Sequence, residues 1–294
     1  MALASAVEHF HEHGYVVLPA HLDVTELQRT LGVLFPTAEE FHGGADPERN
    51  ARFRGDAFAG IDAFPYAAVE WSLATVSEAI VALAEELLGT SAIRLYEAHN
   101  WAKYTGASDY DQRLHRDFGN HTMVVPSPDD ARFAEVEMFV YVHDVPLGAG
   151  PTYVVSRQHT RDLPLWPNVY ERYEHPGLYA REVAADGPAG TVLAYRPDTL
   201  HRGSAMTDAG GARFMLKSSF RTVSDIWTDK LHLMQRLRDD AWYAFVDRAS
   251  PRQLELLGFP PRGHEYWTPA TYAATCLRYP DADLSAFEPQ QPSA

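Results

Sequence analysis

The chain is poor in cysteine and in basic residues, and it contains no long apolar run. Cys276 is the one cysteine among 294 residues, which excludes a disulfide within the chain and is typical of a reducing compartment. There are 25 Lys and Arg against 40 Asp and Glu, a formal net charge of -15. Because nucleic acids and anionic membrane surfaces attract clustered basic residues, we expect neither as a partner.

Segments that would direct the chain into or across a membrane are also missing from the sequence. The N-terminal stretch ALASAVEHFHEHG has neither the basic start nor the apolar run of a signal peptide. No segment reaches the ~18 uninterrupted apolar residues of a membrane-spanning helix. The sequence therefore predicts a cytoplasmic protein.

The chain does have enough hydrophobic residues for a large core, and its sequence pattern divides it into three stretches. Hydrophobic residues make up 46% and aromatic residues 12% of the sequence. Residues 1–90 have mainly helical periodicity, with the longest predicted helix over 67–88. Residues 91–224 read as short strands separated by turn signals, and 225–285 are helical again. We find no internal repeat and no boundary, so the sequence predicts one domain over 1–294.

The central stretch determines the predicted fold class. Runs such as EVEMFVYVHDV, PTYVVS and GTVLAY are short strands with turns between them, and many antiparallel strands of this length are typical of a double-sheet architecture. The prediction is a mainly β protein with flanking helices and a double-stranded β-helix, or jelly-roll, core.

The tripeptide HRD at residues 115–117 is the most informative motif of the chain. Side chains alternate between the two faces of an extended strand, so His115 and Asp117 project the same way. Two histidines and one carboxylate on one face of a metal are the ligand set of non-haem Fe(II) oxygenases, and they leave coordination positions open. His201 is the candidate for the second histidine.

An HxD pair alone has little specificity in a chain with 14 histidines. Its meaning depends on the segment GTVLAYRPDTLHRGSAMTDAGGARFMLKSSF, which predicts a strand, a short loop and a hairpin with His201 on one arm and Arg213 on the other. From the residues alone, the three potential ligands could also form a hydrogen-bonded core cluster or hold a zinc ion without catalytic use.

Four segments, taken in order, resemble the phytanoyl-CoA dioxygenase family, a branch of the Fe(II)/2-oxoglutarate-dependent oxygenases. They are FHEHGYVVLP, LHRDFG, YVHDVPLGAGPTYVVSRQHT and GTVLAYRPDTLHRG. The resemblance implies a jelly-roll enzyme that uses Fe(II), 2-oxoglutarate and O2. It implies His115, Asp117 and His201 as catalytic metal ligands, the first two from one strand and His201 from the facing sheet. Halogenating relatives lack the carboxylate, so Asp117 implies hydroxylation or desaturation.

The same resemblance implies a co-substrate site beyond the metal. In the family an arginine pairs with the far carboxylate of 2-oxoglutarate, and Arg213 suits this role because a guanidinium offers a fixed fork to a carboxylate. The family has a serine two residues after the distal histidine, where this chain has Gly203. A one-residue bulge after His201 would bring Ser204 to that place. Further candidates for co-substrate binding are His99, Lys103 and Phe139.

Contacts to the substrate are the least specific predictions. We expect a small organic molecule, in particular a small or medium secondary metabolite. A coenzyme A thioester would favour a basic collar for its phosphates; the one such cluster, Arg49, Arg52 and Arg54, is better explained as a solvated loop. Core packing is an alternative for most of the candidate substrate contacts, which are Trp101, Tyr104, Tyr110, Phe118, His121 and Tyr141.

The predicted function is that of an Fe(II)- and 2-oxoglutarate-dependent dioxygenase that oxidises, by default hydroxylates, an unactivated C–H bond. Two alternatives use the same ligands. One is a non-catalytic jelly roll that binds a metal or senses a ligand, and the other is a cupin-like metalloenzyme that does not use 2-oxoglutarate. The sequence does not reveal the oligomeric state or the loop that closes over the site.

Overall fold

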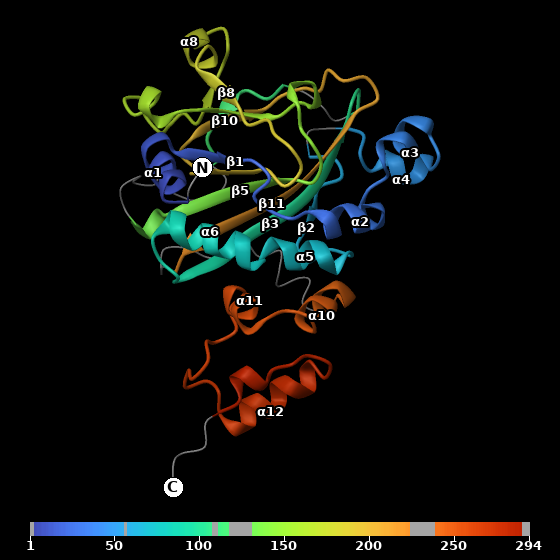
Figure 1. Ribbon diagram of the computed structural model, residues 1–294, viewed down its shortest axis with the longest axis vertical. Helices are drawn as coiled ribbons and strands as arrows, with labels where there is room; N and C mark the ends of the chain where they lie inside the picture. Colours follow the sequence, from blue (N-terminus) through green and yellow to red (C-terminus); the bar gives the residue numbers. More distant parts are fainter. Residues whose placement is uncertain (1–2, 56–57, 108–110, 118–130, 224–238, 290–294) are drawn as a thin grey trace.

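The computed structural model of the chain describes residues 3–55, 58–107, 111–117, 131–223 and 239–289. Two antiparallel β-sheets form its centre, and helices lie against the larger sheet (Figure 1). Within these ranges, no helix combines the length and the apolar character needed to cross a bilayer. The α-helices are α1 (Leu3–His13), α2 (Thr25–Leu34), α3 (Ala38–Gly43), α4 (Pro47–Ala51), α5 (Val69–Thr75), α6 (Glu78–Leu88), α8 (Pro176–Tyr179), α10 (Asp240–Val246), α11 (Pro251–Leu256) and α12 (Pro269–Arg278).

The strands divide into sheets of six and five. The larger sheet has the order β1-β9-β5-β11-β3-β2, and the smaller has the order β7-β4-β10-β6-β8. This arrangement confirms the predicted class of a β core with flanking helices. The strands are β1 (Tyr15–Leu18), β2 (Asp62–Ala63), β3 (Ile93–Tyr104), β4 (Leu114–His115), β5 (Glu135–Tyr141), β6 (Thr152–Val155), β7 (Val169–Tyr170), β8 (Glu182–Ala184), β9 (Val192–Tyr195), β10 (Leu200–Gly203) and β11 (Ala212–Thr222).

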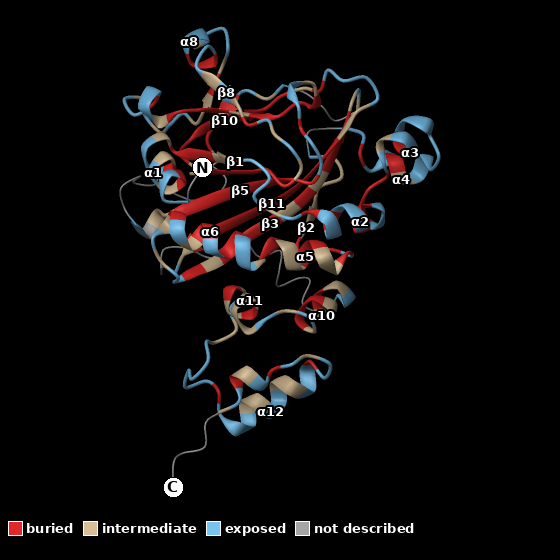
Figure 2. Ribbon diagram, in the orientation of Figure 1, coloured by how far each residue is buried: buried red, intermediate tan, exposed pale blue. Residues whose placement is uncertain are grey.

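The two faces of the larger sheet differ in chemistry because side chains alternate along each strand. Along β5, Val136, Met138 and Val140 are fully buried in the main apolar core that the helices share. Glu137 and Phe139 lie on the opposite face, toward the smaller sheet, where Phe139 packs with Val154 of β6. The larger sheet is therefore buried on both faces (Figure 2), with an apolar outer face and an inner face that carries both charged and aromatic side chains.

The stretch predicted as one helix over 67–88 is two helices. α5 ends at Thr75 and α6 begins at Glu78. The residues at the break, TVS, have low helix propensity because two of them are β-branched and serine competes for backbone hydrogen bonds. The break lets Trp71 of α5 and Ile80 of α6 both be fully buried in the same core.

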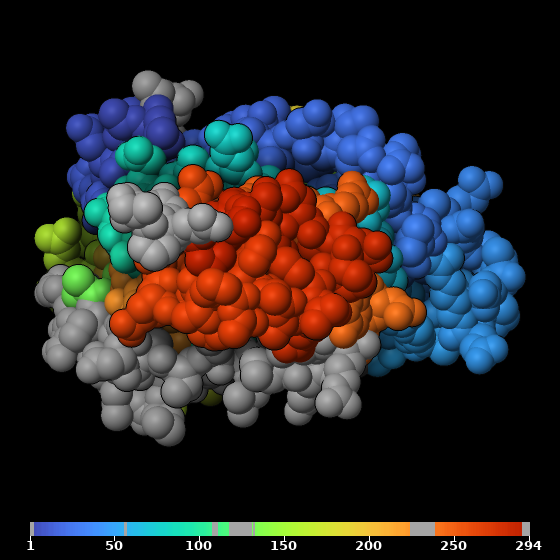
Figure 3. Space-filling model, turned by 90° about the horizontal axis from the view of Figure 1, so that it is seen from below, coloured from blue at the N-terminus to red at the C-terminus, as the bar shows by residue number. Residues whose placement is uncertain are grey.

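The C-terminal helices pack on the helical side of the larger sheet. α10 contacts α5, and α11 contacts β3; Figure 3 shows residues 239–289 spread across the centre of this face. A helical part was predicted over 225–285, and its portion over 225–238 lies outside the described residues. α12 lies within this range, although no residue of it is buried.

The predicted hairpin that joins His201 to Arg213 is wrong. β10, which carries His201, pairs with β4 and β6 in the smaller sheet. β11, which carries Arg213, pairs with β3 and β5 in the larger sheet. Residues 204–211 thus cross from one sheet to the other. The local pattern marks two strands and a turn, but it does not show whether the strands pair with each other.

Candidate metal centre

His115, Asp117 and His201 converge at one point between the sheets. Each offers one potential ligand atom, and these atoms lie within 4.8 Å of one another. Nε2 of His115 is 3.6 Å from Oδ1 of Asp117, and Nε2 of His201 is 3.4 Å from Oδ2. Ligands on adjacent positions of one metal ion stand about 3 Å apart when the bonds are ~2.1 Å long. A small closure of the triad is therefore enough to bind an ion.

The two histidines come from neighbouring strands of the same sheet. His201 in β10 is the cross-strand partner of His115 in β4, so the prediction that His201 comes from the facing sheet is wrong. Side chains of directly opposed residues are about 5 Å apart, which brings the imidazoles together by strand pairing alone. Asp117 follows the end of β4, where its backbone N–H donates to the carbonyl of Pro197 at 3.0 Å.

Backbone carbonyls fix the direction of each imidazole. Nδ1 of His115 is 2.8 Å from the carbonyl oxygen of Arg113, and Nδ1 of His201 is 3.1 Å from that of Thr199. Each Nδ1 therefore carries the proton, and each Nε2 lone pair is directed toward Asp117. Burial lowers the pKa of His201 to about 4, so this ligand is neutral at physiological pH. The donor set fits a divalent ion such as Fe(II).

Tyr195, from the facing sheet, holds Asp117 through Oδ2, the oxygen that also lies nearest His201. Its hydroxyl donates to Oδ2 of Asp117 at 2.9 Å, and its ring centroid lies 4.5 Å from that of His201. Burial and the Asp117 charge raise the pKa of Tyr195 well above its usual value, so the hydroxyl remains a donor. Sequence reasoning missed Tyr195, because a tyrosine on a buried strand carries no local sign of function. The one signal was its position two residues after Leu193 in GTVLAY, which puts both side chains on the same face of the strand.

A cavity of about 380 Å³ opens onto the triad. This volume lies at the small end of the range for ligand pockets. Of the candidate residues other than the triad, His99, Trp101, Lys103, Phe139 and Arg213 line it. The complete lining is Phe58, Ile61, Glu97, His99, Trp101, Lys103, Gln112, His115, Asp117, Phe139, Thr152, Tyr195, His201, Gly203, Arg213, Met215 and Lys217.

Arg213 and Lys103 form one cationic end of this cavity. They are cross-strand partners in β11 and β3, and both are buried, at 2% and 4% exposure. Two buried cations on adjacent strands favour an anion beside them, and the guanidinium can bind a carboxylate through two parallel hydrogen bonds. Trp101 and Phe139 form an apolar wall, with their rings edge to face and 5.4 Å between centroids.

Gly203 borders the cavity where the family pattern has serine. Its N–H donates to Oε1 of Gln112 at 2.7 Å, and a Cβ on Gly203 would lie 3.0 Å from that oxygen. Strand β10 keeps a regular register with β6 through Gly203, so the predicted bulge does not form there. Ser204 is not a lining residue, and its hydroxyl donates to the carbonyl of Pro151. Sequence reasoning missed Gln112, which lies in a loop without periodic pattern.

The tyrosine predictions are also corrected by the structure. Tyr104 follows Lys103, so strand alternation turns it to the outer face, where its hydroxyl donates to the carbonyl of Pro36. Tyr141 is fully buried behind the cavity wall, and its hydroxyl accepts a hydrogen bond from the N–H of Thr152. Neither lines the cavity. Three further candidates lie outside the described residues, namely Tyr110, Phe118 and His121.

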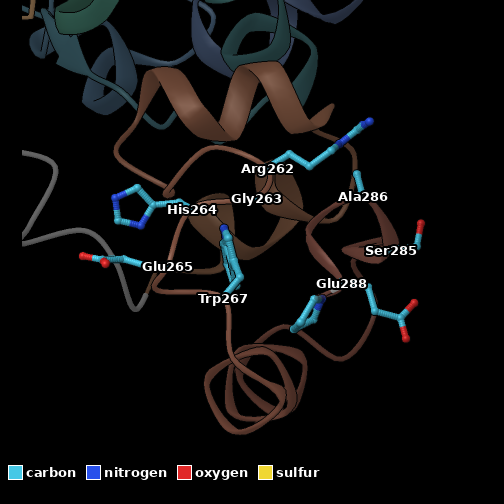
Figure 4. A pocket seen from close by; sticks show the side chains of 9 residues that line it. Arg262, Gly263, His264, Glu265, Trp267, Ser285, Ala286 and Glu288 are labelled. Carbon is cyan, nitrogen blue, oxygen red and sulfur yellow. The ribbon is translucent and has the colours of Figure 1, made fainter. Parts of the chain in front are cut away.

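A second, larger cavity of about 660 Å³ lies in the C-terminal part. Figure 4 shows His264 and Glu265 on one side of it, with Ser285 and Glu288 on the other. These side chains do not converge as the triad does. Within the described residues, the triad is the one group of three or more such side chains that could hold a metal ion. The candidate site is therefore the cavity between the sheets.

Solved structures with the same architecture include three enzymes. The epimerase SnoN, in complex with Fe3+, α-ketoglutarate and nogalamycin RO, has 18% identity and a TM-score of 0.55, over 77% of this chain and 93% of SnoN. The carbocyclase SnoK has 18% identity and a TM-score of 0.55, over 79% of this chain and 90% of SnoK. EctD from S. alaskensis has 17% identity and a TM-score of 0.56, over 76% of this chain and 79% of EctD. At these identities the likeness shows the fold, and it confirms the predicted jelly-roll architecture.

Sequence comparison gives the family. No curated protein matched the chain. The family model of phytanoyl-CoA dioxygenase (PhyH) matches residues 10–214, a range that contains all three triad residues and Arg213. With a match over well more than half of its length, and with the metal-binding triad and the cationic pair in one cavity, this chain belongs to the phytanoyl-CoA dioxygenase family.

Proposed function

We propose that this protein is an Fe(II)- and 2-oxoglutarate-dependent dioxygenase that oxidises, by default hydroxylates, an unactivated C–H bond of a small organic molecule. The observation that carries the proposal is a single cavity lined both by the His115, Asp117 and His201 triad and by the Arg213 and Lys103 pair. The triad suits a metal with open positions, and the pair suits the distal carboxylate of a diacid.

Each group in the cavity has a separate task. His115, Asp117 and His201 hold the metal, and Tyr195 orients Asp117. When bound, iron with 2-oxoglutarate and O2 supplies the oxidising chemistry. The protein's part is to orient the co-substrate through Arg213 and to exclude water with walls such as Trp101 and Phe139.

The cavity supports a small substrate. Its described volume, about 380 Å³, has to hold both the co-substrate and the reacting part of the substrate. The basic cluster considered for coenzyme A does not line it: Arg49 donates to the carbonyl of Gly32, and Arg54 lies over the ring of Phe41 at 4.6 Å. SnoN is described as an epimerase and SnoK as a carbocyclase, and EctD was crystallised with 5-hydroxyectoine. Reactions other than hydroxylation are therefore compatible with this fold.

Anaerobic titration tests the proposal. Addition of Fe(II) and then 2-oxoglutarate should produce a weak visible charge-transfer band. Arg213→Ala should raise the 2-oxoglutarate concentration needed for the band by at least tenfold. Arg221→Ala is the matched control: Arg221 is a buried arginine of the same strand that pairs with Glu135 and does not line the cavity.

A substrate screen read out as succinate release then identifies the reaction, with product mass shifts of plus 16 for hydroxylation or minus 2 for desaturation. Absence of the band would favour the non-catalytic metal-binding or ligand-sensing alternative. A bound metal and an active enzyme without succinate production would favour the cupin-like alternative.

A further inference from the structure

A third cavity, of about 460 Å³, shares no lining residue with the cavity that contains the metal triad. It lies where the end of α1 meets the short 3₁₀ helix Arg157–His159 and the loop between β9 and β10. Three arginines are among its lining residues, so their charge balance decides which ligand fits. The lining is His11, Glu12, Arg116, Arg157, Thr160, Arg161, Leu163, Leu165 and Asp198.

Arg116 is the most buried of these arginines, at 1% exposure. It stands between two metal ligands in the chain, but strand alternation turns it to the opposite face of the smaller sheet. Its Nε donates to the carbonyl of Asp198, and its Nη1 donates to the carbonyl of Pro164 and the hydroxyl of Tyr170. Within the described part of the chain, Nη2 has no hydrogen bond and the guanidinium has no carboxylate partner.

Thr160 and Arg161 add two further donors to the same cavity. Thr160 is 3% exposed, and among the described residues its hydroxyl has no hydrogen-bond partner. Arg161 is exposed, and over the same ranges its guanidinium has neither an ion pair nor a hydrogen bond. Two guanidinium groups and a hydroxyl around one cavity are a set of donors that suits the oxygens of an anion.

The two carboxylates of the lining do not neutralise these donors. Asp198 pairs with Nε of Arg157 at 3.2 Å and with Nε of Arg196 at 3.0 Å. The Glu12 side chain is 60% exposed, so solvent screens its charge. Burial, and then the charges of Arg196 and Arg157, lower the pKa of His11, which keeps this side chain neutral at pH 7.

A buried arginine charge is costly unless an anion lies beside it. We propose that this cavity is a binding site for a small phosphate monoester, separate from the metal centre. Arg116, Thr160 and Arg161 bind the phosphate oxygens, and the partly buried side chains of Leu163 and Leu165 contact the organic group. A phosphate suits the site better than a carboxylate does, because a dianion matches two arginines. The inference does not depend on the proposed function.

Calorimetric titration of the metal-free protein at neutral pH tests the inference. The probes are phenyl phosphate, inorganic phosphate and benzoate. We expect phenyl phosphate to bind at least tenfold more tightly than benzoate and severalfold more tightly than inorganic phosphate. Its affinity should persist in Arg213→Ala, which lacks the guanidinium of the other cavity. No binding of phenyl phosphate, any other order of affinities, or loss of binding in Arg213→Ala would overturn the inference.

Variants then place the phosphate in this cavity. Arg161→Ala removes an exposed side chain without core contacts, so the protein should fold and bind phenyl phosphate at least tenfold more weakly. Arg181→Ala is the matched control, because Arg181 is another exposed arginine that does not line the cavity. Thr160→Val keeps the shape and removes the hydroxyl, so the affinity should fall severalfold. An unchanged affinity in Arg161→Ala, or an equal loss in Arg181→Ala, would contradict the assignment.

Discussion

The hydroxyl of Tyr195 and the carboxylate of Asp117 join the two sheets at the metal centre. Their hydrogen bond is 2.9 Å long, with Tyr195 on the larger sheet and Asp117 at the end of a strand of the smaller one. Both triad histidines belong to the smaller sheet. Tyr195 is thus a contact through which the larger sheet sets the orientation of a metal ligand.

Removal of this hydroxyl should weaken metal binding. Removal of a side chain that hydrogen-bonds a metal ligand commonly lowers metal affinity about 10- to 100-fold. Tyr195→Phe should therefore raise the Fe(II) dissociation constant by that factor, measured by anaerobic titration. Tyr141→Phe is the control, because it removes another buried tyrosine hydroxyl of the same sheet, one that accepts from Thr152. Equal effects of the two variants on iron affinity would show that Tyr195 acts through stability alone.

The contact between Gly203 and Gln112 should control co-substrate affinity. A Cβ at Gly203 would meet Oε1 of Gln112 at 3.0 Å and Nζ of Lys103 at 3.7 Å. Gly203→Ala should therefore displace the glutamine side chain and raise the KM for 2-oxoglutarate severalfold. In Gly203→Ala/Gln112→Ala the crowding is gone, so the two effects should be non-additive in a double-mutant cycle. Additive effects would mean that the two side chains do not interact.

Lys103 should contribute to co-substrate binding and leave metal binding unchanged. It is the cross-strand partner of Arg213 and is 4% exposed. Loss of one cation beside a bound carboxylate lowers the binding affinity about tenfold or more. Lys103→Met should therefore raise the KM for 2-oxoglutarate by at least that factor. Fe(II) affinity, measured without 2-oxoglutarate, is the internal control. A parallel loss of iron affinity would contradict a role confined to the co-substrate.

The metal-free protein should lose stability in mild acid through His201. Burial lowers the pKa of this side chain from 6.5 to about 4, so between these values the unfolded chain binds a proton there and the folded chain does not. Stability therefore rises with pH across this window and falls as pH decreases through it. The full effect is at most about 3 kcal/mol.

Chemical denaturation of the metal-free protein at pH 7 and at pH 5 measures this dependence. His201→Gln has no group that titrates in the window, so its free energy of unfolding should depend less on pH than that of the wild type. The same pH dependence in both proteins would assign the effect to other groups.

The sequence already contained most of the metal centre. His115 and Asp117 stand two residues apart, and His201 precedes the arginine at a spacing similar to the family pattern. Alternation along β3 likewise indicated that His99, Trp101 and Lys103 share a face, and all three line the cavity. Tyr104 was a candidate substrate contact with core packing as the alternative, and the same alternation puts it on the opposite face from Lys103, in the outer core.

The sequence by itself determined residue identity, strand periodicity and the face on which each side chain lies, because these depend on local backbone geometry. Only the tertiary structure decided that His201 pairs with His115, that Arg213 belongs to the other sheet, and that Tyr195 reaches Asp117. It also decided that Lys217 lies between Glu97 and Glu137. Such contacts join strands far apart in the chain, and a strand's own pattern records which face is buried but not which strand becomes its neighbour.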